Sequence, residues 1–272
     1  MMDLIQLDIV GIIKQRLGRR SKWLPAFALR PLERIIRQRE LNAMLRAAYP
    51  EEGSGFSRRI LEHLEIRVEV EGLDCVPGGE PLVFASNHPL GGLDGIALVS
   101  VLGERYGDDR VRVVVNDMLM HVAPLAGVFL PVNKYGAQGR RAAALLNESL
   151  AAGRHVVMFP AGLVSRLGDD GRVADLEWQK AFVQKALDYG RRIVPVRFEA
   201  ANRPRFYRLA RLRKRLGIRV NLEQATLPAE LCATRGKTFR ITFLPAVDPS
   251  GLRDAGESTR DIAARIRRLV CG

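Results

Sequence analysis

The chain has 272 residues, 47% of them apolar, which is enough to bury one sizeable α/β core, alone or with a small helical appendage. Its 43 lysines and arginines against 30 aspartates and glutamates give a formal net charge of +13, which favours an anionic partner such as nucleic acid, anionic lipid headgroups or a phosphorylated substrate. No run approaches the roughly 18 consecutive apolar residues of a transmembrane helix, and the three cysteines have none of the spacings used for zinc or for redox pairs.

Residues 1–49 are predicted to be helical, and Pro25 and Pro31 divide them into at least two helices. Basic residues flank the apolar positions, a composition suited to lying on an anionic membrane surface. Helices packed on the domain with a solvated basic face are an equally good interpretation. We expect an amphipathic, basic N-terminal segment over residues 1–60 and an α/β domain over residues 61–272. The N-terminus lacks the order of a signal peptide, so we expect a cytoplasmic protein, peripheral on the inner face of the cytoplasmic membrane.

From residue 66 onward, short apolar runs alternate with helical patterns. Predicted strands cover residues 66–70, 81–85, 111–115, 155–159, 193–198 and 239–244, and predicted helices cover residues 94–101, 137–152 and 177–189. This alternation predicts an α/β fold with a largely parallel mixed sheet flanked by helices. In such sheets ligands bind beyond the carboxyl ends of the strands, which is where the unusual residues of this sequence lie.

The predicted strand at residues 81–85 runs directly into Asn87 and His88, and a loop with two glycines leads on to Asp94. A histidine at a strand end, with a carboxylate able to fold back toward it, fits a general base and its orienting partner. On a regular helix a spacing of six residues would place the two side chains roughly 120° apart, so the glycines must bring them together. Two alternatives stay open: Asp94 as the N-cap of the following helix, and His88 as a hydrogen-bonded loop histidine.

Three later segments contain further candidate residues. Ser165 and Arg166 follow an apolar strand and a Pro-Gly turn, and Arg166 could bind phosphate or carboxylate in a bidentate fork; a surface arginine on a connecting loop is the favoured alternative. Lys134, Arg140 and the start of the helix predicted from residue 137 could form an anion site, although a glycine-rich helix start is also a common structural device. Pro195 lies inside a predicted strand, which indicates an edge, a bulge or a strand beginning.

In order along the chain, these segments resemble the blocks of the lysophosphatidic-acid acyltransferase-like superfamily, which includes the glycerolphosphate acyltransferases. The resemblance covers about residues 80–200. The sequence Asn-His-Pro-Leu-Gly-Gly-Leu-Asp-Gly at residues 87–95 is similar to a branch with an expanded loop that includes hemolysin-like and amino-acid-lipid O-acyltransferases. Five residues separate His88 from Asp94, where the family commonly has four.

The resemblance implies transfer of a fatty acyl group from acyl-ACP or acyl-CoA, as co-substrate, to a hydroxyl of a lyso-lipid, with no cofactor and no metal. It implies that His88 deprotonates the acceptor hydroxyl, that Asp94 fixes its tautomer and raises its basicity, and that the alkoxide attacks the thioester directly. The remaining matches assign substrate binding to Asn87, Lys134, Arg140, Gly162, Ser165 and Arg166, and the acyl side of the site to Val194 and Pro195.

Two departures from the family's blocks bear on the acceptor. Lys134 stands where the family commonly has a phosphate-binding arginine, and Ala161 stands where it usually has a glutamate. The expected acceptors are therefore lysophosphatidic acid or a monoacylated amino-acid lipid, such as lyso-ornithine or lyso-glycine lipid, whose carboxylate could meet Arg166.

Two other classes of function fit parts of the sequence. A non-enzymatic protein that binds nucleic acid or a membrane fits the basic stretch at residues 203–219, but leucines recur there at helical spacing and no nucleic-acid motif is recognisable, so we expect no nucleic-acid partner. A metal-dependent hydrolase would need further ligands beside His88 and Asp94, and the other histidines form no close ligand spacing.

Overall fold

The computed structural model describes residues 35–132, 136–218 and 221–272. Within them, seven strands form one sheet in the order β1-β9-β8-β2-β5-β3-β4. These strands are β1 (Arg67–Glu71), β2 (Val83–Ser86), β3 (Val111–Asn116), β4 (Phe129–Val132), β5 (His155–Met158), β8 (Ile193–Glu199) and β9 (Thr238–Phe243). The β8–β9 pair is antiparallel and the other neighbours are parallel, which confirms the predicted α/β fold with a largely parallel mixed sheet.

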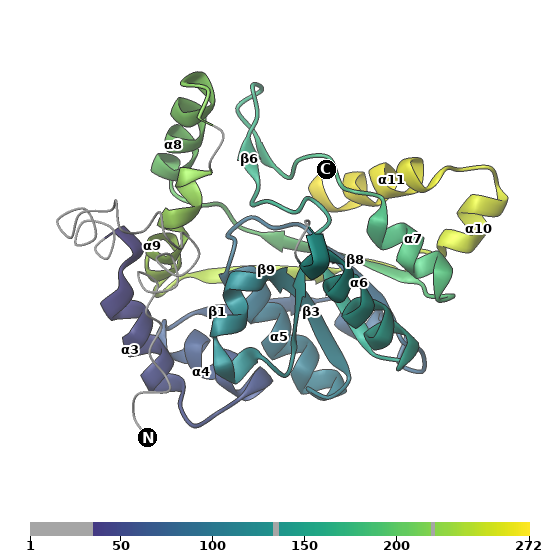
Figure 1. Cartoon of the computed structure of the whole chain (residues 1–272), viewed down its shortest axis with the longest axis horizontal. Coiled ribbons are helices and arrows are strands. Elements are labelled where there is room, and N and C mark those ends of the chain that lie inside the picture. The colour runs from purple at the N-terminus through teal and green to yellow at the C-terminus, as the bar shows by residue number, and fades with distance from the viewer. Residues whose placement is uncertain (1–34, 133–135, 219–220) are drawn as a thin grey trace.

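Helices cover both faces of the sheet (Figure 1). They are α3 (Gln38–Ala48), α4 (Gly53–His63), α5 (Leu93–Tyr106), α6 (Gly136–Ala151), α7 (Ala181–Asp188), α8 (Pro204–Arg215), α9 (Leu227–Cys232), α10 (Pro249–Asp254) and α11 (Thr259–Cys271). Short 3₁₀ segments are η3 (Leu73–Cys75), η4 (Asp117–His121), η5 (Ala123–Leu125) and η6 (Leu222–Thr226). A small antiparallel hairpin, β6 (Arg166–Leu167) and β7 (Val173–Ala174), lies outside the main sheet.

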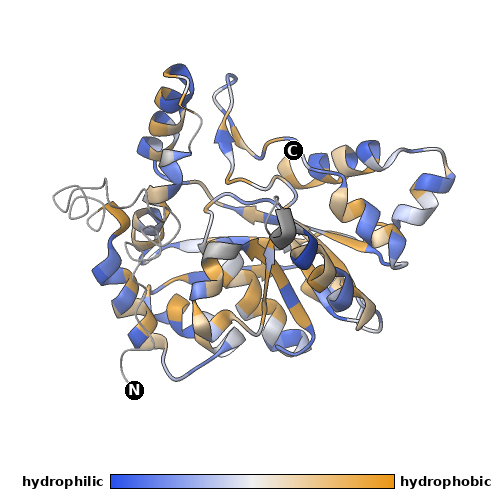
Figure 2. Ribbon diagram, in the orientation of Figure 1, coloured by the Kyte–Doolittle hydropathy of each residue, from blue (hydrophilic) through white to orange (hydrophobic). Residues whose placement is uncertain are grey.

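The apolar core is divided by the sheet, because successive side chains of a strand point to opposite faces. On β2, Phe84 packs in a cluster with apolar residues of α3, α4 and α5, whereas Val83 and Ala85 pack in a second cluster with residues of α7 and α11. Figure 2 shows the hydrophobic colouring concentrated in the strands of the sheet. A strand buried on both faces is held rigidly, so β2 gives the residues that follow it a fixed position.

The predicted elements differ from the observed ones at a few places. Helix α5 continues to Tyr106, well past residue 101, and α7 begins at Ala181 rather than at residue 177. Two hydrogen bonds accompany the later start of α7: Trp178 donates locally to Asp175, and Gln179 N donates to the distant Pro160 carbonyl, so residues 175–179 are not helical. Strand β4 was not predicted; it is short, lies at the sheet edge and contains a proline, as edge strands tolerate.

Pro195 lies in β8, an interior strand, at a bulge. The pairing of β8 with β9 matches Val196 to Phe243, whereas the neighbouring bridge matches Ile193 to Val247. Between these two pairs the segment that follows β9 advances four residues while β8 advances three, which is one extra residue opposite β8. The ladder is therefore already interrupted at Pro195, which has no N–H to donate. Of the three positions that an internal proline indicates, the bulge is the one observed.

The described part of the 1–60 segment packs on the sheet domain. Met44 and Leu45 of α3 and Phe56 and Ile60 of α4 are buried in the same cluster as the residues of α5. Residues 1–34, which include most of the predicted amphipathic segment, lie outside the described residues. Among the described helices, none combines the length and the hydropathy needed to cross a bilayer.

Candidate active site

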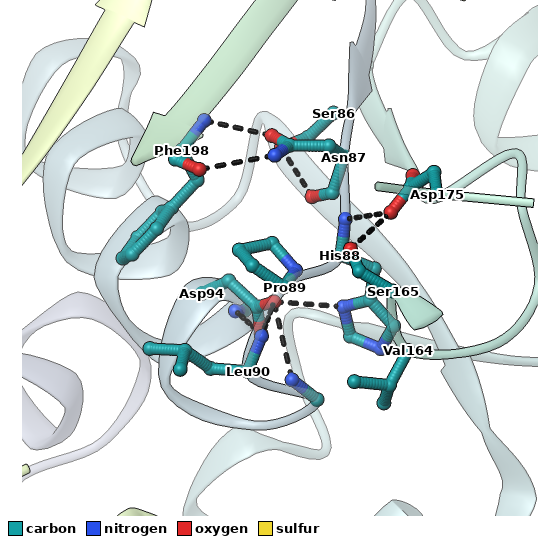
Figure 3. A network of polar contacts seen from close by, with 12 residues as sticks. Ser86, Asn87, His88, Pro89, Leu90, Asp94, Val164, Ser165, Asp175 and Phe198 are labelled. Carbon is teal, nitrogen blue, oxygen red and sulfur yellow. Dashed lines mark hydrogen bonds and ion pairs between the residues drawn. The ribbon is translucent and has the colours of Figure 1, made fainter. Parts of the chain in front are cut away.

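The end of β2 is fixed to β8 by the side chain of Asn87. Its Nδ2 donates to the Phe198 carbonyl at 3.0 Å, and its Oδ1 accepts from Phe198 N at 2.7 Å. This reciprocal pair uses both polar atoms of the amide (Figure 3). Asn87, predicted to bind substrate, therefore makes an anchoring contact that sets where His88 leaves the sheet.

His88 and Asp94 are brought together as the sequence predicts. His88 Nδ1 lies 3.0 Å from Asp94 Oδ2, and the Asp94 side chain is fully buried while the His88 side chain is 19% exposed. The His88 ring also packs against Phe159, with ring centroids 4.3 Å apart. Because Nδ1 faces the carboxylate, Nε2 on the opposite side of the ring is the nitrogen that can accept a proton from a bound hydroxyl.

Asp94 organises the glycine loop as well as the histidine. Its Oδ2 accepts from Leu90 N at 3.1 Å and Gly91 N at 3.2 Å, and its Oδ1 accepts from Gly95 N at 3.1 Å. The N-cap position of α5 is occupied by Gly92, so the interpretation of Asp94 as that cap is wrong. The carboxylate instead faces backward across the loop, toward the histidine.

His88 and Asp94 each stabilise the charged form of the other. Burial disfavours the protonated ring, but the charge and the contact of Asp94, with a smaller contribution from Asp175, outweigh it and raise the pKa of His88. Burial likewise disfavours the Asp94 carboxylate, but His88 and the loop amides outweigh it and lower the pKa of Asp94. A neutral His88 is thus a stronger base than an isolated imidazole, and Asp94 stays ionised beside it.

Gly91 is the residue that allows the loop to turn back. Its φ is +82°, and a Cβ added there would lie 2.6 Å from Val164 Cγ2 and 2.9 Å from Leu227 Cδ1. Both the left-handed backbone and the close packing therefore require glycine.

We expect Gly91→Ala to lower the free energy of unfolding by about 1–3 kcal/mol and to reduce activity, because the strained loop would move Asp94 away from His88. Urea unfolding and the transfer rate measure the two effects. Gly92→Ala is the matched control, since a Cβ at Gly92 would meet no described heavy atom within 4 Å. Equal behaviour of the two variants would contradict the role assigned to Gly91.

A second buried carboxylate, Asp175, was not singled out in the sequence. It is 3% exposed, and its Oδ1 accepts from His88 N at 3.2 Å and from Ser165 Oγ at 2.5 Å. Ser165, predicted to bind substrate, is itself buried and donates its backbone N–H to the His88 carbonyl at 2.9 Å. The two residues lie at opposite ends of the β6–β7 hairpin, and Figure 3 shows both beside the main chain of His88.

Arg166 is held in an ion-pair cluster. Its Nη2 lies 2.8 Å from Glu223 Oε1, its Nη1 donates to the Val164 carbonyl at 3.0 Å, and its guanidinium lies over the Phe206 ring at 5.4 Å. Arg213 Nε lies 2.9 Å from the other oxygen of Glu223, whose side chain is fully buried. Arg166 is thus not a surface arginine, and its guanidinium already has a carboxylate partner.

The remaining predicted residues are placed as follows. Lys134 lies outside the described residues, and Arg140 is exposed near the start of α6. Gly162 is exposed in a turn after β5, where its φ is +65° and its N–H donates to the Phe159 carbonyl. Val194 and Pro195 are buried in β8, with Val194 in the core cluster. Their proposed contacts with substrate stay predictions.

Comparison with known proteins bears on the class of this site. The family model described as Acyltransferase matches residues 12–269, nearly the whole chain. The chain belongs to this acyltransferase family. The acyltransferase is also 40% identical over 237 residues to a lyso-glycine lipid O-acyltransferase of Phocaeicola vulgatus, covering 87% of this chain and 84% of that protein. A lyso-glycine lipid O-acyltransferase of Bacteroides thetaiotaomicron is 38% identical over 241 residues, covering 89% and 88%.

A solved structure is also similar to this acyltransferase. It is the 1-acyl-sn-glycerophosphate acyltransferase PlsC from Thermotoga maritima, with a TM-score of 0.46 and 16% identity, covering 88% of this chain and 93% of that one. The predicted membership of the superfamily and the predicted enzyme class, an O-acyltransferase, are confirmed by the family match and by the two curated relatives.

Proposed function

We propose that this acyltransferase moves a fatty acyl group from acyl-ACP or acyl-CoA to the free hydroxyl of a monoacylated amino-acid lipid, with lyso-glycine lipid as the first candidate. The observation on which this rests is the contact of 3.0 Å between His88 Nδ1 and the buried Asp94 at the carboxyl end of β2. The choice of acceptor is supported by the relatives, which are named for lyso-glycine lipid and match over more than four fifths of their own length.

In this mechanism the acceptor hydroxyl donates its proton to His88 Nε2 as its oxygen attacks the thioester carbonyl carbon. The new C–O bond forms, the C–S bond breaks, and the proton passes from the imidazolium to the departing thiolate. Asp94 stabilises the imidazolium that exists between these steps. The acyl group goes directly from sulfur to oxygen, with no acyl-enzyme.

The charges around Arg166 support an acceptor with a carboxylate. Arg166 and Arg213 share the single carboxylate of Glu223, so these three side chains have a net charge of +1. An added carboxylate from the glycine headgroup would balance that charge. Ala161, which follows β5 and is buried, has no carboxylate that would repel the headgroup.

An assay with defined donors and acceptors tests the proposal. Labelled acyl-ACP and acyl-CoA are each offered with lyso-glycine lipid, lyso-ornithine lipid, a monoacylated serine lipid and lysophosphatidic acid. We expect the highest kcat/KM with lyso-glycine lipid. Preference for lysophosphatidic acid would contradict the acceptor while leaving the class of enzyme in place.

We also propose that the protein binds the inner face of the cytoplasmic membrane, and that α8 takes part. Phe206, Tyr207 and Ala210 form the buried face of this helix. Leu212, in the last turn of α8, and Leu216, at its C-cap, are not part of that face and are 53% and 64% exposed. The exposed basic residues around them are Arg208, Arg211, Lys214 and Arg215. Exposed leucines among cations fit an anionic lipid surface.

Helix α8 rises beside the β6–β7 hairpin, above the sheet (Figure 1), and Arg211 Nη2 donates to the Gly168 carbonyl of the hairpin at 3.1 Å. The hairpin follows the carboxyl end of β5 and α8 follows that of β8, at the same edge of the sheet where His88 follows β2. Contact of α8 with lipid would therefore bring the acceptor close to the site.

The double variant Leu212→Ser/Leu216→Ser is expected to reduce binding to phosphatidylglycerol-containing vesicles by about tenfold or more, because two apolar side chains no longer enter the bilayer surface. Vesicle co-sedimentation measures this. Leu269→Ser in α11 is the matched control, since Leu269 is 45% exposed on another helix. Unchanged binding of the double variant would contradict a role for α8 and leave residues 1–34 as the segment to delete next.

A further inference from the structure

Asp175 is a buried carboxylate in the segment between β7 and α7, with both oxygens occupied. Its Oδ1 accepts from His88 N and Ser165 Oγ, and its Oδ2 accepts from Trp178 Nε1 at 2.9 Å. A carboxylate with so little exposure is costly unless such donors compensate for the lost water. The donors here include the backbone of the residue that we propose as general base.

The peptide groups of His88 are held on both sides by the ends of the β6–β7 hairpin. Asp175, after β7, accepts from the N–H of His88, and Ser165, before β6, donates to its carbonyl. Ser165 Oγ joins the two ends by its hydrogen bond of 2.5 Å to Asp175. The backbone position of His88 is therefore set by this pair as well as by the end of β2.

The main chain at Asp175 is held in turn by α11. Arg267 of α11 donates to the carbonyl of Asp175, and its Nε donates to the Leu176 carbonyl at 3.0 Å. Trp178 packs edge-on against Phe182 of α7 with ring centroids 5.7 Å apart. A carboxylate fixed by two helices can hold its partner precisely, as positioning of a catalytic group requires.

The ionisable groups that face this arrangement are few among the described residues. Asp94 and Asp175 both act to raise the pKa of His88, and of these two carboxylates only Asp94 contacts the ring. Cys271 and Arg267 of α11 face Asp175 from the other side. Asp175 therefore has two routes of influence on His88, the position of its backbone and the charge near its ring.

We propose that Asp175 is a positioning residue for His88, holding its main chain so that Nδ1 meets Asp94 and Nε2 stays free for the acceptor hydroxyl. This inference rests on the proposed function of His88 as general base. It makes Ser165 and Asp175, at the two ends of the β6–β7 hairpin, part of the framework that holds the general base, because both contact His88.

The test compares Asp175→Asn with Asp170→Asn in steady-state acyl transfer over a range of pH. Asp170 is the matched control because it lies in the same hairpin, is exposed, and accepts only from nearby Arg172 N among the hydrogen bonds of the described residues. Asp175→Asn is expected to lower kcat by about tenfold to a hundredfold with little change in KM. Loss of its charge should also move the pH inflection of His88 to lower pH.

A purely structural role for Asp175 would reduce the amount of folded protein and leave the inflection where the parent has it. Ser165→Ala and Trp178→Phe remove single donors and keep the carboxylate, so both should lower kcat with a smaller shift of the inflection than Asp175→Asn gives. They also keep the proposal testable if Asp175→Asn fails to fold. Folded Asp175→Asn or Ser165→Ala with parental kcat would overturn the proposal.

His88→Ala, measured in the same series, separates this proposal from the one on which it rests. An inactive His88→Ala beside a parental Asp175→Asn would remove only the role of Asp175. An active His88→Ala would remove the proposed function of His88 itself.

Discussion

The His88→Ala variant is expected to transfer acyl groups about 10²–10⁴-fold more slowly than the parent, with the fold intact. The reason is that Nε2 of this ring is the proposed acceptor of the hydroxyl proton, while Asp94 would remain without a base to orient. The structural cost should be small, because the His88 side chain is partly exposed and its main-chain hydrogen bonds do not depend on the ring. Initial rates at saturating thioester, with circular dichroism on the same samples, measure both expectations.

The matched control is His121→Ala, which removes an exposed histidine at the end of η4. It should keep the parental rate. A folded His88→Ala protein with a rate close to that of the control would show that the site has been assigned to the wrong residue.

Asp94→Asn is expected to reduce the rate by about a hundredfold or more, because the amide can present an N–H to Nδ1 and favour the wrong tautomer of His88. The amide also has one oxygen where the carboxylate offers two to the loop amides of Leu90, Gly91 and Gly95. Thermal unfolding of the variant separates a weakened loop from a lost catalytic role.

The pH dependence of Asp94→Asn has a defined sign. Activity needs neutral His88, so in the parent the rate rises with pH through the raised pKa of His88. Without the charge of Asp94, burial of the ring is opposed less strongly, and the pKa of His88 falls. The remaining activity should therefore have its inflection at lower pH than in the parent. An inflection that stays in place or moves to higher pH would contradict the coupling of the two residues.

The sequence predicted the parts of the site that are close along the chain. His88 and Asp94 are six residues apart, and a strand end followed by a glycine loop indicated their approach, while an N-cap role for Asp94 and a loop role for His88 stayed open. The strand containing Phe84 was predicted for a similar local reason, since an unbroken apolar run is typical of a strand buried on both faces.

The contacts that were not predicted join distant segments. Asp175 reaches His88 across 87 residues, and Glu223 reaches Arg166 across 57, so neither pairing leaves a pattern in the local sequence. The amide of Asn87 is similar, because its partner Phe198 lies on another strand. Such contacts depend on the order of strands in the sheet, which a single sequence does not specify. The local sequence offered one signal, an Asp-x-x-Trp at residues 175–178, which overlaps the start of the helix predicted over residues 177–189.

The most direct measurement follows a labelled acyl group from thioester to lipid in a rapid-quench experiment with the parent and His88→Ala. Enzyme at high concentration is mixed with labelled acyl-ACP and lyso-glycine lipid, and the label on protein and on lipid is separated at each time. Direct transfer activated by His88 predicts label in the diacylated lipid with the parent, none bound covalently to the enzyme, and background levels with His88→Ala. Label accumulating on the enzyme before the lipid, or equal lipid labelling by both proteins, would contradict it.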